Sequence, residues 1–116
     1  MAVKSNIIID QGADFEVAIN VTDANTAPIS LTGYTGQAQI RKYYTSSRSY
    51  DFDVTIEPET GEVILALSAA ASSAIPAGRY LYDCIIVNEE NVISRIVEGI
   101  VTINPKITRR LPPQGN

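Results

Sequence analysis

The chain has 116 residues, of which 45% are hydrophobic and 19% are charged. These proportions are typical of a globular chain and lie far from those of disordered segments, and the length fits a single hydrophobic core. The formal net charge of −4 at pH 7 argues against nucleic acid or an anionic membrane surface as the main partner. We therefore expect one folded domain that binds neither nucleic acid nor membrane.

Several residue types that carry enzyme chemistry are missing. The chain has no histidine, no tryptophan and one cysteine. It lacks the commonest general base, the histidine-activated nucleophiles and the most frequent transition-metal ligand, which excludes most enzyme mechanisms. The lone Cys84 closes no intrachain disulfide and provides no zinc-binding cluster. We expect a non-enzymatic protein with no metal or other cofactor.

The start of the chain predicts no targeting segment. Its apolar run is short and is followed at once by Asp10, unlike a secretory signal peptide, and the sequence has no run of about 18 apolar residues. The expectation is a soluble protein made without export.

Strands dominate the first half of the predicted structure. A short apolar run over residues 6–10 predicts a first strand, and strict alternation over residues 14–22 predicts a second that is buried on one face. Turn formers over residues 23–28 predict a loop, and alternation resumes over residues 37–43 as a third strand.

The second half begins with a predicted hairpin. Residues 51–56 and 63–67 alternate on either side of a strong turn signal. The alanine-rich residues 68–74 then predict one or two helical turns with Ser68 as the N-cap. Residues 79–88 and 92–103 carry tyrosine and β-branched side chains on both faces, which predicts a central hairpin covered on both sides.

These elements predict an all-β protein, an antiparallel β-sandwich of about seven strands with one short helical turn between strands. A jelly roll or a small barrel is the alternative. We assign residues 1–104 to this domain. Prolines near the end of the chain interrupt regular strand pairing, so that residues 105–116 are predicted to form an extended or flexible C-terminal arm.

One segment resembles immunoglobulin-like and fibronectin-III-like domains. Residues 75–84 (IPAGRYLYDC) are similar to the start of their sixth strand, where a glycine turn precedes a tyrosine that folds back onto the corner. The resemblance implies that role for Tyr80 or Tyr82. The second cysteine and the core tryptophan of antibody domains are absent, which argues against a disulfide-bonded cell-surface domain.

A more particular resemblance comes from three segments in order: residues 31–41 (LTGYTGQAQIR), 60–71 (TGEVILALSAAA) and 75–83 (IPAGRYLYD). Together they are similar to small immunoglobulin-like structural proteins of tailed bacteriophages, including the N-terminal domain of phage baseplate upper proteins. The resemblance implies a virion protein made in the host cytoplasm and built into the tail, baseplate, neck or capsid surface as decoration. Other virion proteins and copies of the same chain are the implied partners, and no catalytic motif is carried over.

Three tyrosines form the candidate ligand surface. Tyr43, Tyr44 and Tyr50 flank a serine-rich loop, and aromatic rings stack on sugars while their hydroxyls bond polar groups. Strand propensity also accounts for tyrosine at such positions. A carbohydrate- or receptor-binding module of a virion is therefore the second functional hypothesis.

Paired acids raise a third hypothesis. The pairs resemble calcium ligands or the carboxylates of a glycosidase, and they are Asp51/Asp53, Glu57/Glu59 and Glu89/Glu90. The spacing matches no helix-loop calcium site. We interpret these acids as a solvated face, and an acid-dependent hydrolase using Asp51 and Asp53 is the remaining alternative.

The predicted arm carries candidate partner contacts, which are Lys106, Ile107, Arg109, Arg110 and Leu111. Such a segment becomes ordered on a neighbouring subunit when it pairs as an added strand and its basic side chains meet acids. A frayed terminus is the alternative interpretation.

Overall fold

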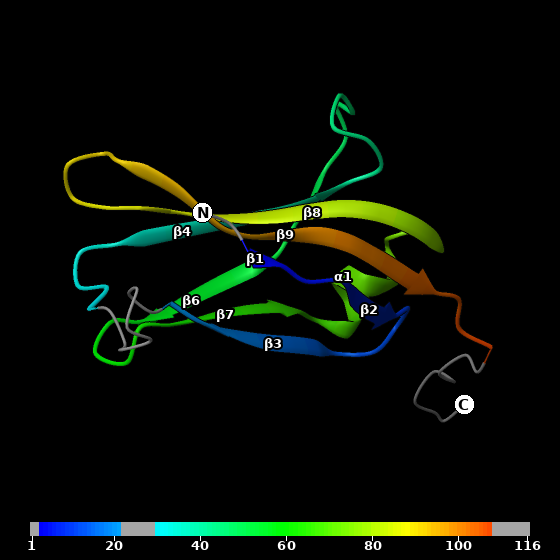
Figure 1. Cartoon of the computed structure of the whole chain (residues 1–116). Coiled ribbons are helices and arrows are strands. Elements are labelled where there is room, and N and C mark those ends of the chain that lie inside the picture. The colour runs from blue at the N-terminus through cyan, green and yellow to red at the C-terminus, as the bar shows by residue number, and fades with distance from the viewer. Residues whose placement is uncertain (1–2, 22–29, 108–116) are drawn as a thin grey trace.

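The computed structural model describes residues 3–21 and 30–107, which form two packed β-sheets and one short helix (Figure 1). The larger sheet contains β1 (Val3–Lys4), β2 (Ile7–Asp10), β4 (Thr35–Arg41), β5 (Tyr50–Asp51), β8 (Gly78–Val87) and β9 (Ile93–Asn104). The smaller sheet contains β3 (Phe15–Asn20), β6 (Asp53–Glu57) and β7 (Glu62–Leu67). The predicted all-β sandwich is confirmed. The predicted loop over residues 23–28 and residues 108–116 of the predicted arm lie outside the described residues.

The strand order is that of an immunoglobulin-like sandwich. The larger sheet has the order β1-β9-β8-β4-β5 with β2 also on β9, and the smaller sheet has the order β3-β7-β6. The other strand pairs are antiparallel, as predicted, and the first two strands are the exception. They run parallel to β9, with Ile7 opposite Val101 and Asp10 opposite Asn104. Parallel neighbours need a long connection, and here nearly the whole domain separates the partners in sequence.

The hydrophobic core fills the space between the two sheets. Its largest fully buried side chains are Ile9, Leu31, Ile40, Leu65, Ile75, Ile103, Val63, Val101 and Cys84. In β3 the half-buried Phe15, Val17 and Ile19 pack against this core, as their alternation predicts. Cys84 is confirmed as a core residue, and its neighbour Ile86 is also buried.

The hairpin of β8 and β9 forms as predicted, but it is covered on one face only. Burial alternates along β8, with Tyr80, Tyr82 and Cys84 buried and Leu81 and Ile85 half-exposed. No described layer covers the outer face. The β-branched and aromatic residues there reflect strand propensity rather than burial on both sides.

The predicted helix is α1 (Ala69–Ser73), and it begins at the expected N-cap. The hydroxyl of Ser68 accepts a hydrogen bond from the backbone N–H of Ala71 at 3.1 Å. The fully buried Ser72 donates its hydroxyl to the carbonyl of Ala13 at 2.8 Å and accepts from the N–H of Gly12 at 3.0 Å. These bonds fix the helix against the turn between β2 and β3.

The strand predicted over residues 51–56 divides between the two sheets. Tyr50 and Asp51 pair with β4, the N–H of Phe52 donates to Ala38 at 3.0 Å, and from Asp53 onward the chain pairs with β7. The chain therefore crosses the edge of the sandwich at the buried Phe52, whose ring lies 6.1 Å from that of Tyr82.

Both tyrosines of β8 are structural. The hydroxyl of Tyr80 donates to the carbonyl of Pro76 at 2.6 Å, four residues upstream, which is the folded-back arrangement that the resemblance implies. The hydroxyl of Tyr82 instead donates to Ser5 at 2.6 Å, between β1 and β2.

Candidate functional site

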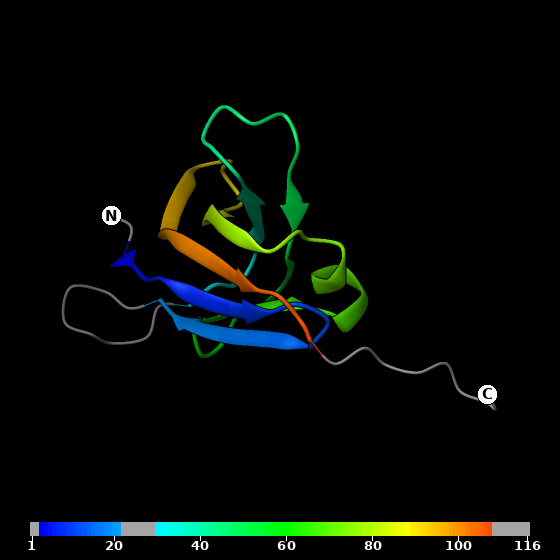
Figure 2. The same cartoon turned by 90° about the vertical axis from the view of Figure 1, so that its right-hand side faces the viewer.

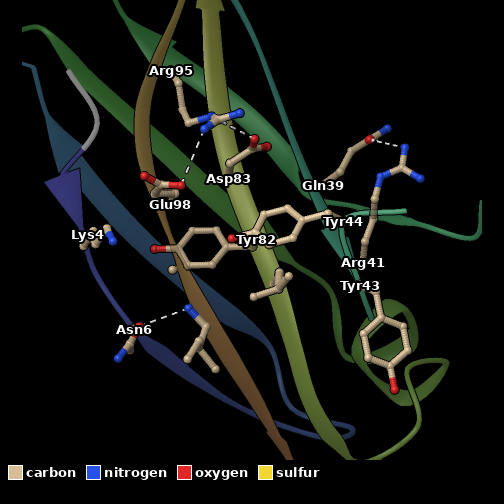
Figure 3. A pocket seen from close by; sticks show the side chains of 13 residues that line it. Lys4, Asn6, Gln39, Arg41, Tyr43, Tyr44, Tyr82, Asp83, Arg95 and Glu98 are labelled. Atoms are coloured by element: carbon tan, nitrogen blue, oxygen red, sulfur yellow. Dashed lines mark hydrogen bonds and ion pairs between the residues drawn. The ribbon is translucent and has the colours of Figure 1, made fainter. Parts of the chain in front are cut away.

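A groove of about 650 Å³ lies on the outer face of the larger sheet (Figure 3). Its side chains come from β1, β4, β8 and β9 and from the loop that follows β4. Leu81 and Ile100 provide its apolar part, and Tyr43 and Tyr44 border it on the loop side. The groove combines a concave shape with apolar and polar side chains, so we take it as the candidate binding site.

Strand register explains why these side chains gather there. Gln39 lies opposite Asp83, which lies opposite Glu98, so the three form one polar row across β4, β8 and β9. A neighbouring row contains Arg41, Leu81 and Ile100 in the same way. Because alternate residues of a strand share a face, these rows face outward while their neighbours enter the core.

The N-terminal strands extend both rows. Lys4 pairs with Glu98 in the parallel register of β1 and β9. The side-chain oxygen of Asn6 accepts a hydrogen bond from the N–H of Ile100 at 3.0 Å, so that it replaces a backbone carbonyl in the ladder. The groove therefore depends on residues separated by more than ninety positions in the sequence.

Charged side chains line the groove in a fixed arrangement. The guanidinium of Arg95 lies 3.2 Å from Asp83 and 3.5 Å from Glu98. Arg41 donates to Gln39 at 2.9 Å and also to the carbonyl of Ser46, which fastens the loop to β4. Exposed ion pairs contribute little to stability, but here they hold planar donors and acceptors along the groove. This array suits a ligand with many hydroxyl groups.

The structure brings two of the three candidate tyrosines to the groove. The side chain of Tyr44 is 83% exposed and that of Tyr43 is 64% exposed. Figure 3 shows their rings pointing in different directions, with Tyr44 reaching toward β8. Tyr50 lies opposite the buried Ile40 and packs edge-on against Tyr80, with ring centroids 6.3 Å apart. Tyr50 is therefore separated from the other two by the sheet.

The predicted arm is described only at its start. The N–H of Lys106 donates to the side chain of Gln11 at 3.3 Å, and its ammonium donates to Ser73 at 3.4 Å. Ile107 is 95% exposed. The other three candidate contacts, Arg109, Arg110 and Leu111, lie outside the described residues.

The acids proposed as hydrolase carboxylates belong to different sheets. Asp51 is on β5 and accepts a hydrogen bond from Gln39 at 3.0 Å, whereas Asp53 begins β6. Both are exposed. Among residues 3–21 and 30–107, no group of three or more acids or cysteines is placed to hold a metal ion. Over the same residues no helix is long and apolar enough to cross a membrane.

Sequence reasoning missed most of the groove. Gln39, Arg41 and Asp83 occupy polar positions of alternating strands, which marks them as outward-facing. The same pattern does not indicate which residue of another strand lies beside them. One feature of the sequence does point to the groove: a strand with alternating polar residues, β4, is followed directly by Tyr43 and Tyr44.

Comparisons with known proteins give no family. No protein-family model matches the chain, and no curated protein is significantly similar to it. Among solved structures, an internalin-like protein of Listeria monocytogenes superposes with a TM-score of 0.49 at 16% sequence identity. That match covers 89% of this chain and 28% of the other chain. A similarity at this level carries no argument about function.

Proposed function

We propose that this chain is a non-enzymatic structural module of a tailed-phage virion, assembling through protein–protein contacts with other virion proteins and with copies of itself. The resemblance of residues 31–41, 60–71 and 75–83 to small phage structural proteins supports the virion setting. These segments hold the chain's turns and strand starts, so the resemblance concerns the scaffold. Tail, baseplate, neck and capsid decoration are all locations compatible with this role.

The observation that carries the proposal is the charge on the smaller sheet. Its outward-facing side chains include the acids Glu16, Asp53, Glu57 and Glu62, and no lysine or arginine. Glu57 lies directly opposite Glu62. Like charges in that position destabilise a sheet, and a cationic partner removes the penalty. The face is therefore suited to a basic protein surface.

The cations of the domain are elsewhere. The outward-facing side chains of the larger sheet include Lys4, Arg41, Arg79 and Arg95. The same face also carries the acids Asp10, Asp51, Asp83 and Glu98, so it is close to neutral, whereas the outer face of the smaller sheet is acidic. A difference in charge between two faces of a protein steers association and fixes the orientation of partners, as repeated assembly requires.

Mass spectrometry of purified particles tests the proposal. We expect the protein in virions that have been separated from lysate, at a constant ratio to the major virion proteins. Washing at increasing salt concentration should release it progressively, since exposed charges are screened over about 10 Å at 0.1 M salt. Detection in infected-cell lysate together with absence from purified particles would contradict the proposal.

The groove supports a second candidate function, recognition of a carbohydrate or receptor. The specific observation is Tyr44, 83% exposed beside planar polar side chains that suit hydroxyl groups. On this hypothesis Tyr44→Ala abolishes binding on a glycan array, whereas Tyr50→Ala retains it because Tyr50 lies on the other side of the sheet. Equal loss in both variants would indicate a folding defect and would remove the support for this function.

A further inference from the structure

Strand β6 has one unpaired edge. It is the last strand in the order β3-β7-β6, so that its hydrogen-bonded neighbour in the described structure is β7. Beyond its other edge lies a notch of about 210 Å³ between β6 and β4, lined by Gly36, Ala38, Phe52 and Val54 among others. A Cβ atom at Gly36 would lie 2.8 Å from Val54, so a glycine is needed for the close approach of the two strands.

The side chains of β6 give this edge a definite chemistry. Asp53, Thr55 and Glu57 are exposed on the outer face, while Val54 and Ile56 are half-buried on the inner face. Within residues 3–21 and 30–107 the ion pairs involve Arg95, so neither acid of β6 has a cationic partner there. Two β6 edges would repel each other, because each carries acids. The edge therefore rejects its own copy and favours a basic strand.

The start of the C-terminal arm has the matching pattern. Residues 106–110 are Lys-Ile-Thr-Arg-Arg, with cations four positions apart and a threonine midway. The acids of β6 are also four positions apart with a threonine midway. In antiparallel alignment Lys106 lies opposite Glu57, Thr108 opposite Thr55, and Arg110 opposite Asp53. Opposite charges that face each other across two strands stabilise a sheet, and so do paired threonines.

The same register also places two residues of the arm at the inner face of β6. The apolar Ile107 then neighbours Ile56 at the inner face, and Arg109 neighbours Val54 beside the notch. Ile107 is 95% exposed in the isolated chain, so such pairing would remove apolar surface from water.

The position at which the arm leaves the domain indicates that it pairs with β6 of a second copy rather than with β6 of its own chain. The end of β9 lies beside the turn between β2 and β3 (Figure 2), where Asn104 pairs with Asp10 and Lys106 is bonded to Gln11. This is the β3 side of the smaller sheet, and β7 separates β3 from β6. Lys106 cannot reach Glu57 of its own chain while it keeps its bond to Gln11.

We propose that residues 106–110 of one copy pair with the free edge of β6 in a second copy, adding a fourth strand to the smaller sheet. This inference rests on the proposed assembly function and names the contact through which copies associate. Each copy both donates an arm and accepts one, so the contact builds rings or filaments when it repeats head-to-tail and a two-fold dimer when two copies exchange arms.

A reciprocal charge exchange in the full chain tests the pairing. One variant reverses the edge, Asp53→Lys with Glu57→Lys, and the other reverses the arm, Lys106→Glu with Arg110→Glu. Analytical ultracentrifugation of the wild type should show association that increases with concentration. Each variant alone should associate at least about tenfold more weakly, because its arm and edge then carry the same charge.

The mixture of the two variants is the decisive sample. Reversed arms then meet reversed edges and wild-type arms meet wild-type edges, so association should return to near the wild-type level. Glu90→Lys is the matched control, because Glu90 is an exposed acid in the turn between β8 and β9, outside the smaller sheet, and it should leave association unchanged. Thermal melts of every variant show whether each is folded before its association is compared.

Two results would contradict the proposed pairing of the arm with β6 but would not contradict the proposed function. If the mixed variants fail to associate while the wild type does, copies assemble through another contact. If the wild type stays monomeric at all concentrations, the arm does not dock on a second copy, and presence in purified particles would then indicate a different virion protein as partner. Absence from particles, by contrast, contradicts the proposed function itself.

Discussion

The phenol of Tyr82 donates a 2.6 Å hydrogen bond to the backbone carbonyl of Ser5, across 77 positions of sequence. Tyr82 is buried in the central strand of the larger sheet, and Ser5 lies between the two short N-terminal strands. Gly99 on β9 lies opposite Tyr82, and a Cβ atom there would collide with the Ser5 carbonyl. One tyrosine and one glycine thus fasten the start of the chain to the sheet.

Tyr82→Phe should destabilise the domain by about 0.5–1.5 kcal/mol, the usual net contribution of one hydrogen bond. The ring still fills its place in the core, so packing against Phe52 is retained. Urea unfolding measures the change. Tyr43→Phe, which alters an exposed ring, is the matched control and should unfold like the wild type. Equal midpoints for all three proteins would show that the bond to Ser5 contributes nothing.

Gly99→Ala should displace the N-terminal strands while leaving most of the sandwich intact. The added methyl group meets the backbone of Ser5, which cannot move without breaking its bond from Tyr82. Amide hydrogen exchange is the measurement, and protection should fall first at Ser5, whose N–H donates to Glu98 at 2.9 Å. Protection in β7 should be unaffected. Uniform loss of protection throughout the chain would point to global unfolding instead.

Ile86→Ala should reduce the free energy of unfolding by about 2–5 kcal/mol, because it leaves a cavity in the core. Ile86 is 3% exposed, whereas its neighbour Ile85 faces outward and is half-exposed. Ile85→Ala should therefore have a clearly smaller effect. Chemical denaturation of both variants compares the two faces of β8. A larger loss of unfolding free energy in Ile85→Ala than in Ile86→Ala would contradict this assignment of the two faces of β8.

Stability should decline at alkaline pH, in part because of Cys84. Burial, with a further contribution from Asp83, raises the pKa of the thiol from 9.0 to about 12. The unfolded chain loses this proton above about pH 9 and the folded chain does not, so the contribution of Cys84 is complete below pH 9 and is lost toward pH 12. Burial also raises the pKa of Tyr80 and of Tyr82, which act in the same direction.

Urea midpoints from about pH 8 to about pH 11 measure this decline. The wild type should lose stability with a steeper slope than Cys84→Ala, whose remaining slope reflects the tyrosines. Comparison of slopes removes the constant effect of the smaller side chain on packing. Parallel slopes would mean that the thiol ionises equally easily in the folded and unfolded chains.

Local features of the sequence determined most of the elements. Alternation predicted β3, β6 and β7 and the face of each that enters the core, because side-chain direction repeats every two residues in any strand. The turn between β6 and β7 follows from Gly61, whose φ of 71° lies in the region that favours glycine. The helix follows from Ser68, which bonds a backbone N–H only three residues away. Each of these causes acts over a few residues.

The tertiary structure decided how those elements meet. The sequence does not indicate that β2 pairs in parallel with β9, that the chain changes sheets at Phe52, or that Tyr50 and Tyr44 lie on different sides of a sheet. Alternation marks a face but not the neighbouring strand, and the register between distant strands is set by packing of the whole core. For the same reason, the groove forms only when four strands are aligned. The open edge of β6 likewise exists only because β6 is the last strand of the smaller sheet.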